Sequence, residues 1–367
     1  MKLFICPACQ QTLHFENSQC TKCQRVLAYL PDQATLTALE PAPDGGDGSL
    51  VALGARGERP RYRMCGNRID HQACNWAVPD QEKDQRFCRA CRLNDVIPNL
   101  ADAQAKQAWI DLEQKKRRLL YSLLELGLPV ESRAENPDGG LAFAFKKDQP
   151  GEGKVFIGHE RGLITINVAE ADSPFREKAR LALGETYRTV LGDFRHEIGH
   201  YYWDRLIASS PTRLLEPFRE RFGDERASYE EAIQRHYKDG APGDWTARFV
   251  SSYASMHPWE DWAESWAHYL HMVDALDTAR SFGLALRPRA AGADQRKLAV
   301  GTGRLDFDDF DDLEQAWVPL TVALNSLNRS MGLADAYPFV LAKPALQKIR
   351  FVHDVVTQVG AAADKAA

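Results

Sequence analysis

The chain lacks a long apolar run and an excess of basic charge. No stretch of eighteen uncharged apolar residues occurs, and no basic amino-terminal segment precedes an apolar run, so we expect neither a membrane span nor a secretory signal. A net charge of -5 argues against general affinity for nucleic acid. With 44% hydrophobic residues in 367, the chain can build a real core. These features predict a cytoplasmic protein of two or three domains.

Cysteine is absent from the chain after residue 91, because all eight cysteines precede that point. In a reducing compartment such clustering indicates metal ligands and not disulfides. The first four follow the pattern Cys6-x2-Cys9-x10-Cys20-x2-Cys23. Two pairs of thiolates give tetrahedral zinc ligation and stabilise a segment too short for its own core. We therefore expect a zinc ribbon over residues 1–40.

A second set of cysteines predicts a further zinc module over residues 60–98. Its last pair is regularly spaced, but eight residues separate its first two members. His71 could replace the second of these cysteines as a ligand, although four cysteines are available. Spacing alone also leaves open a cluster shared by both sets, or iron in place of zinc. The set comprises Cys65, Cys74, Cys88 and Cys91.

Residues 41–59 are rich in proline, glycine and acid, which is typical of a flexible linker or a long loop. The two zinc modules are therefore expected to move separately. The region that follows is locally basic and carries aromatic residues. A contact with nucleic acid or an acidic peptide is one interpretation, docking of a protein partner is another, and a solvated face around a structural metal is favoured. The residues are Arg56, Arg59, Arg61, Arg63, Arg68, Arg86, Arg89 and Arg92, with Tyr62, Trp76 and Phe87.

The most informative motif is His196-Glu197-Ile198-Gly199-His200. Two histidines four apart share one helix face and can both bind one zinc ion. Zinc lowers the pKa of a bound water to about 7, and the intervening Glu197 can accept its proton during attack on a peptide carbonyl. Flanking apolar residues at spacings of three and four predict an amphipathic helix. Gly199 is unfavourable inside a helix, which suggests close approach of another backbone or of the metal shell.

A catalytic zinc needs a third protein ligand. In the stretch from residue 253 to 264, Pro258 suits the first turn of a new helix, and Glu260 and Glu264 then lie one turn apart on the same face. One of these carboxylates can bind zinc while the other orients a zinc-bound histidine.

An HExxH helix followed by a second helix with Glu-x-x-x-Glu resembles the gluzincin branch of the zincin metallopeptidases. The resemblance implies that Glu260 is the third ligand. Tyr253, seven residues earlier, is similar in placement to the tyrosine of lethal-factor-type zincins that binds the oxyanion. The stretches FRHEIGHYYWDRL and HPWEDWAESWAHYLHMVD resemble a bacterial family of zinc-binding metallopeptidases with an amino-terminal zinc ribbon. This likeness covers most of the chain and names no substrate.

Four other residues are rival third ligands. His257 precedes the proline and is expected outside the helix. Asp261 faces about 100° away from Glu260 on a helix. His268 and His271 lie two and three turns further along, where packing histidines are the favoured interpretation.

The remaining elements predict an α+β catalytic domain over residues 99–360, mostly helical with a small sheet. Residues 101–126 have the spacing of an amphipathic helix. Short β-rich runs follow at LAFAFK (141–146), KVFIG (154–158) and LITINV (163–168). A cap and a first-turn proline at residues 172–174 start the next helix, and Pro344 suits the start of the last one.

Together these features predict a cytoplasmic zinc metallopeptidase with one catalytic zinc and one or two structural zincs. Glu197 would act as general base, Glu264 would orient a zinc histidine, and Tyr253 would bind the oxyanion. The substrate would be a peptide or protein, with a possible protein partner at the ribbons and no nucleic acid or membrane. The alternatives are a zinc-ribbon adaptor, binding protein or nucleic acid, with an inactive zincin-like domain, and a zinc amidase acting on a non-peptide amide.

Overall fold

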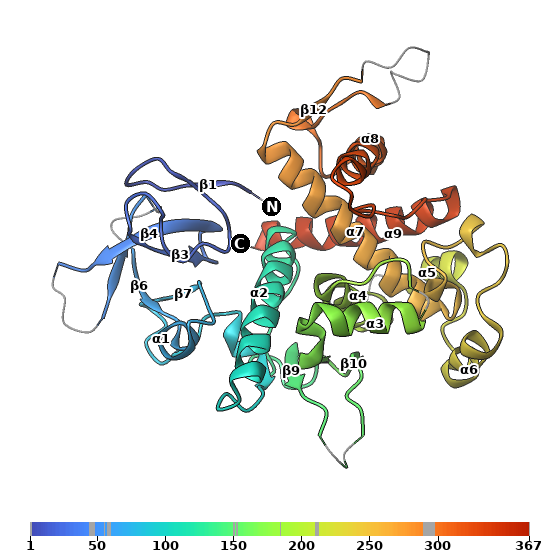
Figure 1. The fold of residues 1–367 in the computed structure, drawn as a ribbon, viewed down its shortest axis with the longest axis horizontal. Coiled ribbons are helices and arrows are strands. Elements are labelled where there is room, and N and C mark those ends of the chain that lie inside the picture. The colour runs from blue at the N-terminus through green and yellow to red at the C-terminus, as the bar shows by residue number, and fades with distance from the viewer. Residues whose placement is uncertain are drawn as a thin grey trace. The chain divides into compact units, whose positions relative to one another are not determined.

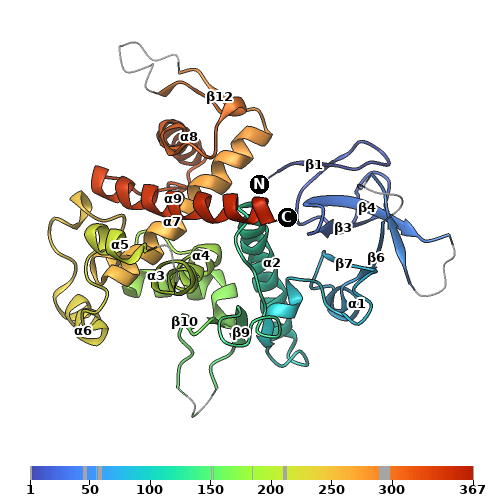
Figure 2. The same ribbon diagram turned by 180° about the vertical axis from the view of Figure 1, so that it is seen from behind.

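The computed structural model describes residues 2–43, 48–54, 56, 60–149, 151, 153–183, 185–209, 213–288 and 298–366. Two compact units are present, and their elements can be followed in Figures 1 and 2. Unit 1 comprises Met1–Glu125, Pro129–Phe156 and Leu163–Asp172. Unit 2 comprises Leu126–Leu128, Ile157–Gly162 and Ser173–Ala367.

Unit 1 begins with an antiparallel strand pair and a five-stranded antiparallel sheet. The pair is β1 (Phe4–Ile5) with β2 (Thr12–Leu13). The sheet has the order β3-β4-β5-β6-β7. Leu30, Leu39 and Tyr62 from three of its strands are buried in one apolar cluster. The strands are β3 (Val26–Leu30), β4 (Thr35–Pro41), β5 (Leu50–Ala52), β6 (Arg61–Met64) and β7 (Ala77–Pro79).

Strand β5 lies inside the segment expected to be a flexible linker, residues 41–59. Ala52 of β5 pairs with Leu39 of β4, and Leu50 pairs with Tyr62 of β6. The interpretation of two separately moving modules is therefore wrong, because one sheet continues from the first cysteine set into the second. Proline and glycine dominated the composition, but three apolar residues were enough to form the pairing strand. Residues 44–47, 55 and 57–59 of this segment lie outside the described residues.

A helix and a small parallel sheet complete unit 1. Within the unit the sheet order is β11-β9-β8, and both neighbouring pairs are parallel. The runs at 141–146 and 163–168 are strands as predicted, whereas residues 154–157 of KVFIG are not. The elements are α1 (Gly66–His71), β8 (Asn94–Val96), α2 (Ala103–Glu125), β9 (Ala142–Lys146) and β11 (Leu163–Asn167), with short 3-10 turns at Cys91–Leu93 and Val168–Ala171.

Helix α2 packs against the cysteine-rich part of unit 1. Arg117 Nη1 donates to the carbonyl of Ala73 at 2.6 Å, and Arg118 pairs with Glu16 at 2.5 Å. The Tyr121 ring lies 5.0 Å from that of Phe15. We expected the catalytic domain to begin at residue 99, with α2; in the structure α2 lies in unit 1, together with the cysteine-rich part.

Unit 2 is mostly helical. The helix starts predicted at residues 172–174 and near Pro344 are present in α3 and α9. The helices are α3 (Ser173–Leu183), α4 (Val190–Tyr202), a π-helix (Trp203–Ala208), α5 (Leu215–Phe222), α6 (Tyr229–Asp239), α7 (Pro258–Ser281), α8 (Phe310–Ser330) and α9 (Lys343–Ala366). Shorter elements are β10 (Gly158–Glu160), 3-10 turns at Trp245–Ala247, Tyr253–Ser255 and Thr302–Arg304, and the pair β12 (Ala285–Leu286) with β13 (Val300–Gly301).

Helices α4 and α7 lie side by side in unit 2 (Figure 1). Their closest approach is at Gly199, where an added Cβ would lie 3.0 Å from the Cα of Ala263 and 3.1 Å from the Cβ of Trp266. The indole of Trp262 donates from Nε1 to the carbonyl of Gly199 at 2.8 Å. Close approach of a second backbone is thus the reason for a glycine at this helical position.

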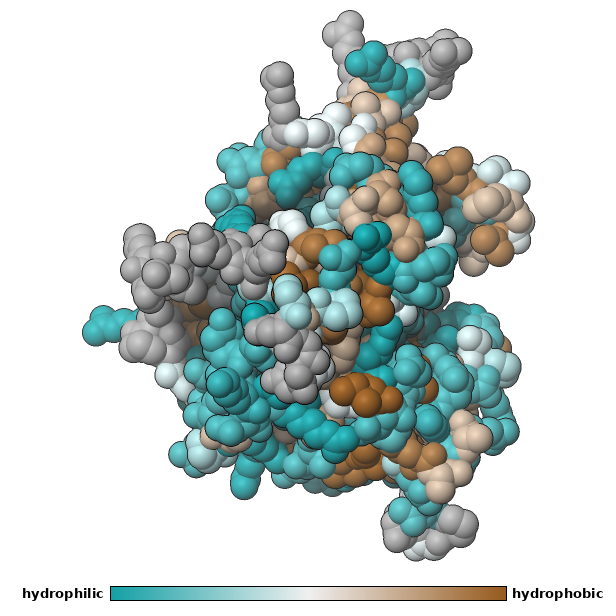
Figure 3. Space-filling view, turned by 90° about the vertical axis from the view of Figure 1, so that its left-hand side faces the viewer, coloured by the Kyte–Doolittle hydropathy of each residue, from teal (hydrophilic) through white to brown (hydrophobic). Residues whose placement is uncertain are grey.

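None of the described helices is both long enough and apolar enough to span a membrane. Figure 3 views one face, on which hydrophilic side chains cover most of the area and hydrophobic ones form separate patches.

We predict that Gly199→Ala lowers the free energy of unfolding by roughly 1–2 kcal/mol, because overpacking costs about 1–3 kcal/mol and the gain in helix propensity returns only part of it. Urea denaturation measures the difference. Gly243→Ala is the control, since a Cβ at that position meets nothing within 4 Å. Equal stability of Gly199→Ala and wild type would contradict the close approach of α4 and α7.

Candidate metal centres

Helix α4 places its two histidines and the glutamate between them near the centre of unit 2. Its first turn is capped by Thr189, whose side chain accepts from the backbone N–H of Gly192. Phe194, Ile198 and Tyr202 bury the apolar face as the sequence spacing predicted. This orientation leaves His196 partly buried, and His200 and Glu197 buried.

Helix α7 brings the carboxylates to the same place. His257 caps the helix by accepting from the backbone N–H of Trp259, and Pro258 occupies the first turn. Glu260 and Glu264 therefore share one face, as predicted. Glu260 is only 1% exposed, so its charge depends on neighbouring groups and not on water.

Three atoms from the two helices form a small triangle. His196 Nε2 lies 2.9 Å and His200 Nε2 lies 3.4 Å from Glu260 Oε2, and the two nitrogens are 3.2 Å apart. Ligands about 2.0–2.1 Å from a tetrahedral zinc are about 3.3 Å from one another. The spacing and the two-imidazole, one-carboxylate donor set therefore fit zinc of the catalytic type, which keeps a fourth position for water.

Glu264 contacts the second ring nitrogen of His196, Nδ1. Its Oε1 lies 2.8 Å from His196 Nδ1, and its Oε2 accepts from the Ser251 hydroxyl at 2.6 Å. Burial raises the pKa of Glu264, but the hydrogen bond and charge of His196 lower it by more. An ionised Glu264 fixes the imidazole tautomer that presents Nε2 to a metal. Sequence reasoning missed Ser251, and no motif marked it.

Glu197 is 7% exposed and lies between the two histidines in sequence. Burial raises the pKa of its carboxyl, and the nearby charges of His196 and His200 oppose that rise without cancelling it. A carboxyl group whose pKa lies above its usual range is better matched to proton transfer near neutral pH.

Two tyrosines lie at the triangle. The Tyr253 ring is 5.9 Å from that of His196, and burial followed by the Glu260 charge raises its pKa. The Tyr229 hydroxyl donates to Glu260 Oε1 at 2.9 Å. Sequence reasoning singled out Tyr253 and missed Tyr229, because Tyr229 begins a different helix, 31 residues before Glu260.

His257 and Asp261, two of the rival third ligands, are occupied elsewhere. His257 Nε2 contacts the carbonyl of Ala227 at 3.0 Å, and its Nδ1 accepts from Trp259 N at 3.1 Å. Asp261 is buried with Lys348 Nζ at 2.5 Å. Neither side chain belongs to the triangle.

The last two rivals are packing histidines, as favoured. His268 Nδ1 lies 2.5 Å from the Tyr337 hydroxyl, and His271 Nδ1 lies 2.5 Å from Arg195 Nη1. Burial lowers the pKa of His268 to about 4. Glu260 is thus the third member of the triangle among the five candidates.

Two aromatic neighbours of His200 were also missed by sequence reasoning. The Trp259 ring centre is 4.1 Å from that of His200, and the His159 ring is stacked parallel to it at 6.4 Å. Burial lowers the pKa of His159 to about 3, so this ring is neutral. His159 lies on β10, and no motif connects that strand with the helix at residue 196.

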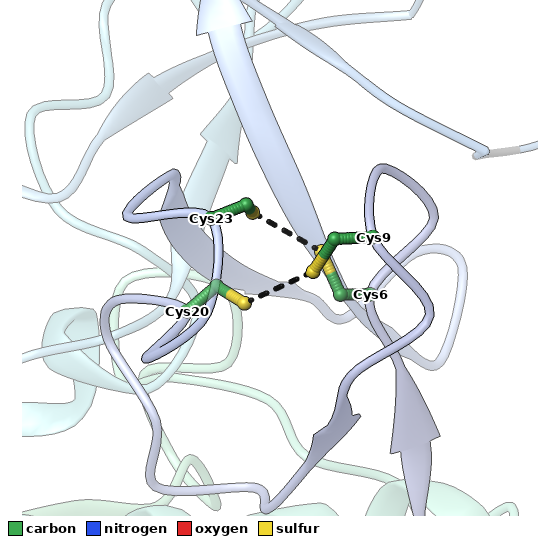
Figure 4. A group of neighbouring side chains, drawn as sticks. All are labelled: Cys6, Cys9, Cys20 and Cys23. Carbon is green, nitrogen blue, oxygen red and sulfur yellow. Dashed lines mark hydrogen bonds between the residues drawn. The ribbon is translucent and has the colours of Figure 1, made fainter.

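The first cysteine set converges as predicted. Figure 4 shows the four side chains from two facing loops with their sulfur atoms directed at one another. Cys6 Sγ lies 3.7 Å from Cys23 Sγ, and Cys9 Sγ lies 3.5 Å from Cys20 Sγ. Thiolates about 2.3 Å from a tetrahedral zinc are about 3.8 Å apart, so the set fits one zinc ion.

The second set forms a separate, fully buried cluster of Cys65, Cys74, Cys88 and Cys91. Cys74 Sγ lies 3.6 Å from Cys88 Sγ, a spacing that also fits zinc. His71 is outside this cluster and packs edge-on to Trp109 at 5.8 Å. Replacement of Cys74 by His71 is therefore wrong, and so is one cluster shared by both sets.

Several arginines of the basic region are engaged within unit 1. Arg63 pairs with Asp80 at 3.2 Å, and Arg92 pairs with Glu82 at 2.9 Å. Arg68 donates to the carbonyl of Ser18 at 3.1 Å. Tyr62 and Trp76 are buried. These contacts favour the interpretation of a structural face around the metal. Arg59 lies outside the described residues.

Among the residues that the structure describes, three donor sets could each hold a metal ion, two made of cysteines and one of two histidines and a carboxylate. Comparison with known proteins agrees. Residues 105–355 match the family described as "Putative zinc-binding metallo-peptidase", and residues 3–102 match a zinc-ribbon domain. The chain belongs to this metallopeptidase family, as the sequence resemblance implied.

The chain has relatives in mycobacteria. It is 41% identical over 359 residues to uncharacterized proteins of Mycobacterium bovis and of Mycobacterium tuberculosis, which covers 98% of this chain and 96% of each relative. No solved structure is significantly similar to it.

We expect about three zinc ions per chain, one for each donor set. Elemental analysis of the purified protein measures the number. His196→Ala should remove one ion, and Cys91→Ala should remove a different one. His71→Ala should remove none and serves as the control for the second cysteine cluster. Two ions in both wild type and His196→Ala would exclude metal binding on α4.

The carboxylates of α7 should differ in their effect on zinc. Glu260→Ala should release most of the ion because it removes a ligand, whereas Glu264→Ala should weaken binding about 10–100-fold because it removes the group that orients His196. Competition with a zinc-sensitive chelator measures both. Glu220→Ala, which removes an exposed carboxylate of α5, is the control and should bind as wild type does. Loss of zinc in His257→Ala with retention in Glu260→Ala would refute the ligand assignment.

Proposed function

We propose that the chain is a zinc metallopeptidase that hydrolyses peptide bonds, with a gluzincin-type, zincin-like catalytic unit. The observation that carries the proposal is the buried Glu197 between two histidines whose Nε2 atoms meet the Glu260 carboxylate. A purely structural site would not need a further carboxyl group at that position. Zinc held there would lower the pKa of water to near 7 and polarise the scissile carbonyl.

Glu197 acts as general base in this proposal. It accepts a proton from the attacking water and later delivers one to the leaving amine. Its raised pKa favours both transfers, because the protonated and ionised forms lie closer in free energy near neutral pH.

Tyr253 and Glu264 assist without exchanging protons. The raised pKa of Tyr253 keeps its phenol protonated, so it can donate a hydrogen bond to the oxyanion that forms on the substrate carbonyl. Glu264 keeps His196 in one tautomer through the 2.8 Å contact at Nδ1.

The substrate class is a peptide or protein, and the zinc ribbons are proposed to bind a protein partner. Eight cysteines without a disulfide, grouped as two zinc donor sets, are the chemistry of a reducing compartment, which supports a cytoplasmic location.

Glu197→Gln should keep the fold and all bound zinc yet lose turnover, because glutamine has nearly the same volume but cannot accept the proton. Mapping of new protein termini in cells with wild type or Glu197→Gln tests turnover and identifies substrates together. Glu230→Gln, an exposed substitution on α6, is the matched control. Identical termini with wild type and Glu197→Gln would refute peptidase activity and favour an adaptor or a non-peptide amidase.

Tyr253→Phe should lower kcat by roughly two to three orders of magnitude, since it removes one oxyanion donor. Zinc content and KM should change little, because the hydroxyl acts on the transition state. Steady-state kinetics on a substrate found by terminus mapping measures the split. An unchanged kcat would show that the tyrosine seven residues before Glu260 takes no part in the reaction.

A further inference from the structure

The Glu260 carboxylate has different partners on its two oxygens. Oε2 faces the two histidine Nε2 atoms, at 2.9 and 3.4 Å. Oε1 accepts from the Tyr229 hydroxyl at 2.9 Å. The Glu260 side chain is 1% exposed, and a buried carboxylate oxygen without a hydrogen-bond donor destabilises the fold. The Tyr229 hydroxyl supplies the donor that Oε1 needs.

Two hydrogen bonds hold the first turn of α6 in a position from which Tyr229 reaches Glu260. Ser228 caps α6 by accepting from Glu231 N at 3.3 Å. One residue earlier, the carbonyl of Ala227 contacts His257 Nε2 at 3.0 Å. His257 is itself the cap of α7, so the first turns of α6 and α7 are joined through one imidazole. The Tyr229 ring packs edge-on against the His257 ring at 5.4 Å.

Tyr229 also touches the proposed oxyanion donor. Burial, followed by the Glu260 charge, raises the pKa of both phenols, and a hydrogen bond between the two hydroxyls adds to the rise at Tyr253 and partly opposes it at Tyr229. One phenol therefore connects Tyr253 to the carboxylate that faces the histidines.

We propose that Tyr229 is a positioning residue that restricts Glu260 to one metal-binding oxygen. Held by this hydrogen bond, Oε1 is turned away from the metal position and only Oε2 remains available as a ligand. Without the hydroxyl, Oε1 is free to turn toward the metal and coordination by two oxygens follows. The inference rests on the metal site of the proposed function but not on turnover.

The test uses the full chain and the metal alone. Tyr229→Phe keeps the ring and its packing and removes one oxygen. Zinc affinity, measured by chelator competition, should fall about 10–100-fold, because Glu260 loses the group that holds it in its ligand geometry and must be ordered when zinc binds. In the cobalt-substituted protein the visible absorption should weaken, as it does when a tetrahedral ion gains a fifth ligand. Tyr237→Phe is the control, because Tyr237 lies on the same helix with an exposed side chain, and it should match wild type in both measurements.

Tyr253→Phe separates the two tyrosines. It should leave zinc affinity and the cobalt spectrum nearly unchanged, since the hydrogen bond from Tyr229 to Glu260 Oε1 remains. Wild-type affinity and spectrum in Tyr229→Phe would overturn the inference while leaving the proposed function intact. If His196→Ala bound as much metal as the wild-type protein, both the inference and the proposed function would be overturned.

Discussion

The close approach of α4 and α7 at Gly199 is the constraint on which the histidine-carboxylate centre depends. Two ligands come from one helix and the third from the other, so the separation of the helices sets the ligand spacing. Because Gly199 has no Cβ, the Cα of Ala263 can approach it closely. The hydrogen bond from the Trp262 indole to the Gly199 carbonyl holds the two helices at this separation. A larger side chain at that position would push apart the atoms that now lie 2.9 to 3.4 Å from one another.

The same contact concentrates negative charge in the interior of unit 2. Glu197 and Glu260 are buried and the Glu264 side chain is 19% exposed, and buried carboxylates are unfavourable unless a positive group or hydrogen-bond donors compensate them. Tyr229, Ser251 and the His196 ring satisfy part of this requirement. A divalent cation at the triangle would satisfy the rest, which gives the centre a physical reason to bind metal apart from any reaction.

Unit 1 needs stabilisation from its metal sites, since its strands are short and its apolar clusters are small. The first cysteine set is partly exposed between two loops, whereas the second is fully buried. Burial lowers the pKa of Arg117 on α2, but Cys74 and Glu113 raise it by more, so its charge is retained beside the second cluster. Helix and metal site thus stabilise each other, which explains why α2 belongs to unit 1.

The sequence by itself indicated the three donor sets, although it left rivals to Glu260 and to Cys74 open. Cysteine spacing, the two histidines one turn apart, Gly199 and the proline before Glu260 are local patterns, and local backbone geometry is enough to predict what they place on one face. It also determined most helices, because their apolar spacing is a property of contiguous residues. It failed at β5, where three residues inside a polar segment form a strand by pairing with partners on either side.

Only the tertiary structure decided which carboxylate oxygen meets the histidines, and which side chains hold the ligands in place. Tyr229, Ser251 and His159 lie on elements far from the motif in sequence, and each is an ordinary residue in its own segment. Tertiary packing likewise excluded His257 and Asp261, which occupy suitable positions along the chain but have other partners. The physical reason is that a side chain's role depends on distance and burial, and long-range contacts between helices set both.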